Sequence, residues 1–124
     1  MTHSEAPQII ELDKPVNEGE SLMFEFSDYA GLISEGFVLR HQGQLYAYRN
    51  LCRHQPRPLD FGDAVFLTDD KRYIMCVHHA AIFEPDTGLC VSGPCEGACL
   101  FHFPVTEEDG KITVTIPPQT IDLE

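Results

Sequence analysis

The chain has few basic residues and no long apolar run. Lys and Arg number 8 against 20 Asp and Glu, which gives a formal net charge of −12 at pH 7. Surfaces that bind phosphate backbones need Lys and Arg, so this balance argues against a nucleic-acid ligand. No stretch approaches the ~18 consecutive apolar residues of a membrane-spanning helix. We therefore expect neither a nucleic acid nor a membrane as a partner.

Export signals are also missing. The segment MTHSEAPQII has no basic start followed by an apolar run, and no twin arginine, so we expect a cytoplasmic protein. Residues 1–124 should form a single domain, because this length allows one sizeable core but no second folded unit.

No segment shows a convincing helical periodicity. Residues 36–49 should form a hairpin that turns at Gln42 and Gly43, and residues 28–35 should form a loop or one helical turn. Many short strands with turns between them indicate an antiparallel all-β domain. Apolar runs bounded by turn residues predict these strands at 8–12, 21–26, 36–41, 44–49, 64–67, 73–76, 81–83, 89–91, 100–105 and 111–116.

The five cysteines do not suggest a disulfide framework. In a reducing compartment they are expected to be metal ligands or buried thiols. Two of them form short pairs with histidine, Cys52-x-His54 and Cys76-x-x-His79, with residues 55–75 between the pairs. Each pair can occupy its own tight loop, and two such loops together offer two sulfurs and two nitrogens to one metal site.

The stretch with these pairs, Asn50 to Glu84, resembles the Rieske family, whose [2Fe–2S] centre has cysteines on one iron and histidines on the other. The resemblance covers about residues 36–116. It implies a Rieske fold, an antiparallel β-sandwich or barrel with a cluster-binding subdomain at about residues 50–97, made of two ligand loops and a proline loop. Downstream it continues through Asp86-Thr87-Gly88, Gly93-Pro94, Pro104-Val105 and Asp109-Gly110.

By this resemblance, Cys52 and Cys76 hold the inner iron of the cluster, and His54 and His79 hold the outer, solvent-facing iron. Imidazoles donate less charge than thiolates, so the potential rises relative to a four-cysteine cluster. His78 offers a competing register, Cys76-x-His78, but the C-x-x-H spacing of the family selects His79. The other histidines are expected to be ordinary surface or strand residues: His3, His41 and His102.

Some positions depart from the family pattern or have no role in it. Pro56 and Ala80 stand where glycines are usual, so one backbone hydrogen bond to the cluster is expected to be lost. The loops also lack the extra cysteines of the disulfide clamp in respiratory Rieske proteins. This absence implies the low-potential ferredoxin type, at the lower end of roughly −150 to +300 mV. Three cysteines remain without an assigned role: Cys90, Cys95 and Cys99. Of these, Cys95 in the proline loop is the most plausible thiol near the cluster.

The resemblance implies a one-electron carrier, a ferredoxin between a reductase and a terminal oxygenase or other redox enzyme, and not an enzyme by itself. A Rieske oxygenase needs a second domain with a mononuclear iron on two histidines and a carboxylate, for which 124 residues leave no room. Two alternatives stay open: a small redox subunit of a reductase complex such as nitrite reductase, and a structural zinc module with the same Cys₂His₂ set. Typical zinc modules use C-x₂₋₄-C pairs, which this site lacks.

Overall fold

The computed structural model describes residues 7–27, 33–51, 59, 66–76, 81–93 and 96–117, and this part of the chain consists of strands and turns. The first sheet has the order β1 (Gln8–Leu12), β10 (Lys111–Ile116) and β9 (Val105–Glu108). The second has the order β2 (Ser21–Ser27), β3 (Ile33–His41), β4 (Gln44–Arg49) and β8 (His102–Phe103). The third has the order β5 (Ile74–Cys76), β6 (Ala81–Phe83) and β7 (Cys90–Ser92).

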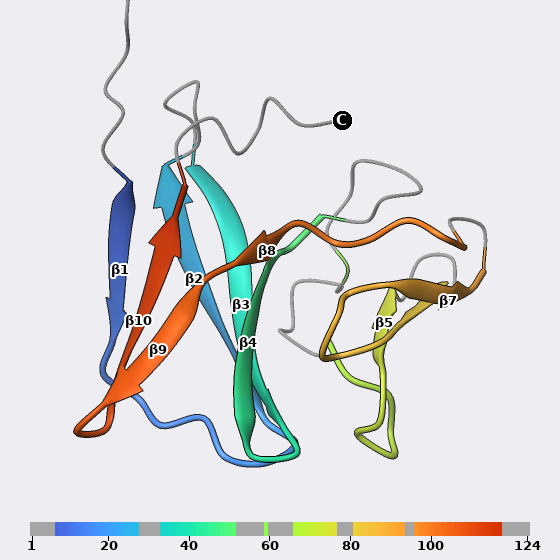
Figure 1. The fold of residues 1–124 in the computed structure, drawn as a ribbon, viewed down its shortest axis with the longest axis horizontal. Helices are drawn as coiled ribbons and strands as arrows, with labels where there is room; N and C mark the ends of the chain where they lie inside the picture. Colours follow the sequence, from blue (N-terminus) through green and yellow to red (C-terminus); the bar gives the residue numbers. More distant parts are fainter. Residues whose placement is uncertain are drawn as a thin grey trace, which may run out of the picture.

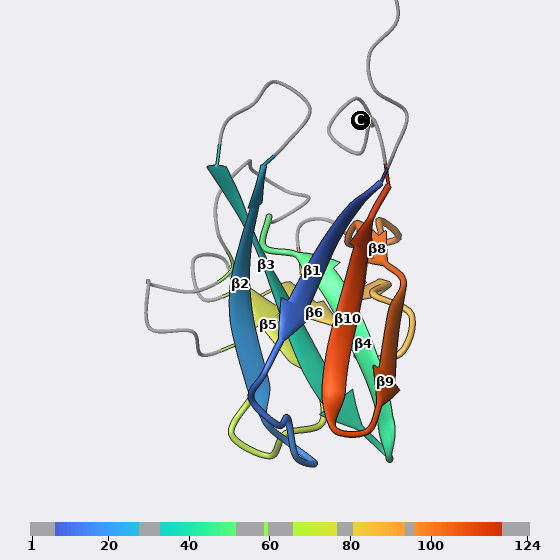
Figure 2. The same ribbon diagram turned by 90° about the vertical axis from the view of Figure 1, so that its left-hand side faces the viewer.

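All strand pairs in these sheets are antiparallel, so the expected antiparallel all-β class is confirmed. Figures 1 and 2 show the first two sheets facing each other, with the third sheet at one side of this sandwich. Within the described ranges, no helix is long and apolar enough to cross a membrane.

The second sheet is the middle layer of the molecule, because β3 and β4 bury side chains on both of their faces. Val38 and Ala47 belong to the apolar cluster shared with the first sheet. Phe37, Leu39 and Tyr48 belong to the cluster shared with the third sheet. Successive strand residues point to opposite faces, so a strand covered on both sides reads as a continuous apolar run, as Phe-Val-Leu does here.

The tight turns follow the residues that favour them. Gln42 and Gly43 have φ of 54° and 82°, and Asp109 and Gly110 have φ of 51° and 80°. Two successive positive φ values are the signature of a type I′ hairpin turn, which matches the twist of the flanking strands. The predicted hairpin with its turn at Gln42 and Gly43 is thus confirmed, with His41 paired to Gln44.

Three predicted boundaries were wrong in part. Residues 33–35 are not a loop, because β3 begins at Ile33, opposite Ser27 of β2. The strand predicted at 100–105 is divided at Pro104, which has no N–H to donate, and its halves β8 and β9 lie in different sheets. Of the strand predicted at 64–67, Leu67 forms only an isolated bridge to Ile74, and residues 64 and 65 lie outside the described part.

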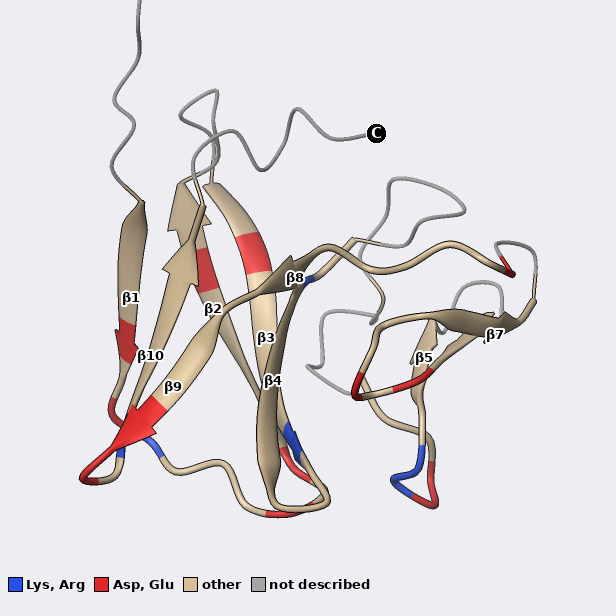
Figure 3. Cartoon of the chain, in the orientation of Figure 1, with Lys and Arg blue, Asp and Glu red and all other residues tan. Residues whose placement is uncertain are grey.

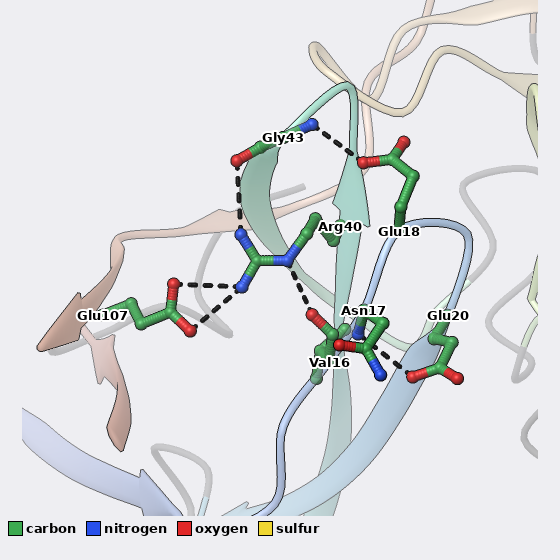
Figure 4. Close-up of polar contacts among 7 residues, drawn as sticks. All are labelled: Val16, Asn17, Glu18, Glu20, Arg40, Gly43 and Glu107. Carbon is green, nitrogen blue, oxygen red and sulfur yellow. Dashed lines mark hydrogen bonds and ion pairs between the residues drawn. The ribbon is translucent and has the colours of Figure 1, made fainter. Parts of the chain in front are cut away.

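A polar network ties the two sheets of the sandwich together (Figure 4). Arg40 of β3 donates from Nε to the Val16 carbonyl at 2.6 Å and from Nη2 to both carboxylate oxygens of Glu107 at 3.0 Å. Glu18 accepts the Gly43 N–H at 2.8 Å, and the backbone donors of the β3–β4 turn, Gly43 first, lower the pKa of its carboxyl group. The β1–β2 connection, the β3–β4 turn and β9 are therefore held as one unit.

Candidate metal centre

Cys76 is the predicted ligand that the described residues contain. It is the last residue of β5 and is fully buried, with 0% of its surface exposed. The other three predicted ligands, Cys52, His54 and His79, lie outside the described residues, and so does the competing His78. The same holds for Pro56, Ala80 and Cys95. Their roles remain predictions.

The second ligand loop begins and ends on one hairpin. Cys76 of β5 pairs with Ala81 of β6 in an antiparallel register, so residues 77–80 form the connection between two paired strands. That connection contains both histidines of the alternative registers.

The flanks of both ligand loops meet in one apolar cluster. Leu59, just beyond the first loop, and Cys76 and Ala81, at the two ends of the second, are all fully buried members of it. Tyr48, near the end of the strand that leads to the first loop, belongs to the same cluster. The fold therefore brings the anchors of the two predicted loops to one side of the second sheet, as a shared metal site requires.

The third sheet also positions the expected proline loop. Gly93, directly after β7, has φ of +107°, and an added Cβ there would lie 2.8 Å from the Cα of Ala81. Glycine is needed at such a conformation and at such a close backbone approach. Residues 93–97 thus start in contact with the end of the second ligand loop, and the Gly97 N–H returns to the Cys90 carbonyl at 3.0 Å.

The remaining described cysteines and histidines are not predicted ligands. Cys90 is buried in β7, with its thiol 3.2 Å from the Ser92 carbonyl, and Cys99 is exposed. His41 ends β3, and burial lowers the pKa of His102 in β8. Among the described residues, no group of three His, Cys, Asp or Glu side chains forms another metal site.

Tyr48 joins the middle sheet to the third sheet. Its buried hydroxyl donates to the Pro85 carbonyl at 2.7 Å, in the turn between β6 and β7. Gly88 leaves room for its ring, since an added Cβ there would lie 2.8 Å from Tyr48 Cε1. Sequence reasoning identified the Asp86-Thr87-Gly88 turn but missed this partner, and only the apolar alternation of β4 hints at an inward-facing ring.

Replacing Tyr48 by phenylalanine should lower the free energy of unfolding by about 1–2 kcal/mol, because the buried Pro85 carbonyl loses its donor. Burial raises the pKa of the Tyr48 phenol well above its ordinary value. The unfolded chain therefore releases this proton first, and stability should fall above about pH 10 in the wild type but less in the variant. Denaturant titrations at pH 8 and pH 10.5 test both points. Tyr46→Phe, two residues earlier in β4, is the control and should change neither value.

The fit of the site to an iron–sulfur cluster follows from its donor set. A buried cysteine sulfur at the base of a hairpin suits iron, because cluster sulfurs are shielded from water by the protein around them. A cysteine and a histidine from each predicted loop would supply the mixed ligation of a Rieske centre. The described anchors are compatible with this group, since Leu59, Cys76 and Ala81 lie in one buried apolar cluster.

Comparisons with known proteins agree with this chemistry. The Rieske [2Fe-2S] domain family matches residues 8–117. The ferredoxin component of an alkene monooxygenase system from Xanthobacter autotrophicus is 27% identical over 101 residues, covering 82% of this chain and 74% of the relative. The family match at residues 8–117 includes all four predicted ligand positions of this chain.

Two solved structures share the fold. The ferredoxin of carbazole 1,9a-dioxygenase from Nocardioides aromaticivorans superposes with a TM-score of 0.62 at 24% identity, over 90% of this chain and 98% of that one. The terminal oxygenase of carbazole 1,9a-dioxygenase from a Novosphingobium species gives a TM-score of 0.70 at 22% identity, over 93% of this chain. This chain spans 31% of that oxygenase chain. The chain belongs to the Rieske [2Fe-2S] domain family, and its cofactor is a Rieske-type [2Fe–2S] cluster.

Proposed function

We propose that this protein is a low-potential Rieske-type ferredoxin that carries one electron at a time from a reductase to a terminal oxygenase. The observation that carries the proposal is the likeness to the ferredoxin component of an alkene monooxygenase system, which is 27% identical over 82% of this chain and 74% of the relative. The fold that the chain shares with a dioxygenase ferredoxin agrees with it.

The proposal assigns Cys52, His54, Cys76 and His79 as the cluster ligands. When bound, the cluster takes up and returns one electron, which is the chemistry a carrier needs. The protein residues bind and shield it: Cys76 offers a buried sulfur, and the hairpin of β5 and β6 presents residues 77–80. We further propose that residues 1–124 act as one domain in the cytoplasm, with residues 50–97 as the cluster-binding part, and that the protein is not itself an enzyme.

The charge of the surface supports a role in docking to a redox partner. Acidic residues occur on β1, β2, β3 and β9 and in the turns around the third sheet (Figure 3). The chain carries a formal net charge of −12. A field of one sign speeds encounter with an oppositely charged surface and weakens as salt is added. A partner with a basic docking surface is therefore favoured.

The two alternative functions, a subunit of a reductase complex and a structural zinc module, are less well supported. The reported relatives are components of oxygenase systems, which favours an oxygenase over a nitrite reductase complex. The family match favours an iron–sulfur cluster over zinc.

An anaerobic redox titration tests the carrier function. Dithionite should reduce the purified protein with one electron per two irons, and an oxidant should restore the original spectrum. Mixing the reduced protein with an oxidised Rieske oxygenase that uses a ferredoxin should transfer that electron, faster at low than at high salt. A protein whose spectrum does not respond to dithionite, or that hydroxylates an aromatic substrate without an oxygenase, would contradict the proposal.

A further inference from the structure

Among the residues that the structure describes, Asn50 is the one buried residue whose side chain is an amide or a charged group, with 5% of its surface exposed. It follows β4 directly and precedes Cys52 by two residues. A buried polar group costs free energy unless its hydrogen bonds are made. We therefore asked which hydrogen bonds stabilise a buried amide at the start of the first predicted ligand loop.

The Asn50 amide joins two segments that are separate in the sequence. Its Oδ1 accepts the Leu59 N–H at 2.7 Å, and its Nδ2 donates to Oε1 of Glu35 at 3.2 Å. Its backbone N–H also donates to the Glu35 carbonyl at 2.8 Å. Leu59 is fully buried in the apolar cluster that contains Cys76. One side chain thus connects the beginning of β3 to Leu59, just beyond the first predicted ligand loop.

The bond to Leu59 closes the base of residues 51–58. This segment starts after Asn50 and ends before Leu59, and it contains Cys52 and His54. The amide satisfies both partners, because it accepts at oxygen and donates at nitrogen. An aspartate would keep the bond from Leu59 but would place its carboxylate against the carboxylate of Glu35.

We propose that Asn50 is a positioning residue for the first ligand loop, which holds the two ends of residues 51–58 together and thereby keeps Cys52 and His54 in place on the cluster. This inference rests on the proposed role of those two residues as ligands. Asn50 does not bind iron itself. It acts through the loop, so its loss should change how firmly the cluster is held and how its outer iron is ligated.

The test exchanges the amide of Asn50 and the carboxylate of Glu35 in the protein with its cluster bound. Asn50→Ala removes both hydrogen bonds, and Asn50→Asp turns the contact with Glu35 into a repulsion. Adding Glu35→Gln to Asn50→Asp restores a donor and an acceptor, now with the amide on the β3 side. Asn17→Ala, in the connection between β1 and β2, is the control. If Asn50→Ala does not fold, the two aspartate variants still decide the question.

Three measurements are made on each variant: iron transfer to bathophenanthroline disulfonate, the EPR line shape after reduction, and hydrogen exchange at the Leu59 amide. Iron release should be about tenfold faster in Asn50→Asp, as expected for the loss of one buried hydrogen bond. The EPR line shape should change, and Leu59 should exchange faster. The double variant should return to within about threefold of the wild-type rate, and the control should match the wild type.

The outcomes separate this inference from the proposed function. Wild-type release, line shape and exchange in Asn50→Asp would overturn the positioning role and leave the ferredoxin function intact. Failure of Glu35→Gln to restore any of the three values would also overturn it. A wild-type protein that holds no iron–sulfur cluster would overturn both.

Discussion

Replacing Cys76 by alanine is expected to abolish the [2Fe–2S] absorption and EPR signals of the purified protein. Cysteine thiolates hold the iron, and alanine has no atom that can replace the sulfur. Cys76 is fully buried at the end of β5, so its sulfur lies where the protein shields it from water. Metal sites of this kind are coupled to folding, so the variant should also unfold at lower denaturant concentration than the loaded wild type.

Cys90→Ala is the matched control for this result. Cys90 is also buried, 1% exposed, in the same sheet and in the same apolar cluster as Cys76. Its replacement should cost about 1–2 kcal/mol of stability from lost packing and should leave iron content and spectra unchanged. Equal loss of iron in both variants would show that Cys76 acts by packing alone, contrary to its assignment as a ligand.

Gly93→Ala is expected to be strongly destabilising. The residue has φ of +107°, and the new Cβ would lie 2.8 Å from the Cα of Ala81. Backbone strain and the clash with a strand backbone each cost about 1–3 kcal/mol. The free energy of unfolding should fall by about 3 kcal/mol or more. Since Ala81 follows the second ligand loop directly, the cluster should also be lost faster on heating.

Gly97→Ala separates the two contributions. Gly97 has a similar φ of +95°, but an added Cβ there meets no atom within 4 Å. This variant should show the backbone strain alone, about 1–2 kcal/mol. Denaturant titrations of both variants, followed by far-UV circular dichroism and by cluster absorbance, give the difference. If Gly93→Ala were no worse than Gly97→Ala, the close approach to Ala81 would have no energetic consequence.

Local chemistry explains why much of the fold could be predicted from the sequence. The apolar alternation of β2, β4 and β10 and the turn at Gln42 and Gly43 depend on residues next to each other in the chain. The residues at 33–35 were missed because their strand is defined by pairing to β2, and Ile33 is 66% exposed. The alternation of apolar and polar residues does not reveal the end of a strand where that end is exposed to solvent.

The type of centre, a Rieske [2Fe–2S] cluster, could be predicted from the sequence, but the contacts that support it could not. Two short pairs of cysteine and histidine offer the ligand set of such a cluster, and the assignment of Cys52, His54, Cys76 and His79 as its ligands stays a prediction. The roles of Asn50 and Tyr48 depend on partners that lie far away in the sequence: Glu35, Leu59 and Pro85. No local pattern encodes such contacts, although a polar residue between a buried strand and a ligand pair is a signal that a search could use.

The EPR spectrum of the anaerobically purified and dithionite-reduced protein decides whether the chain holds a [2Fe–2S] cluster with histidine ligands. We expect a red-brown oxidised protein that becomes EPR-active on reduction, with a rhombic [2Fe–2S] signal and hyperfine couplings to histidine nitrogen. Those couplings would show that imidazoles bind the reduced iron. A colourless, EPR-silent protein with stoichiometric zinc would contradict this assignment, and so would a [2Fe–2S] signal without nitrogen couplings.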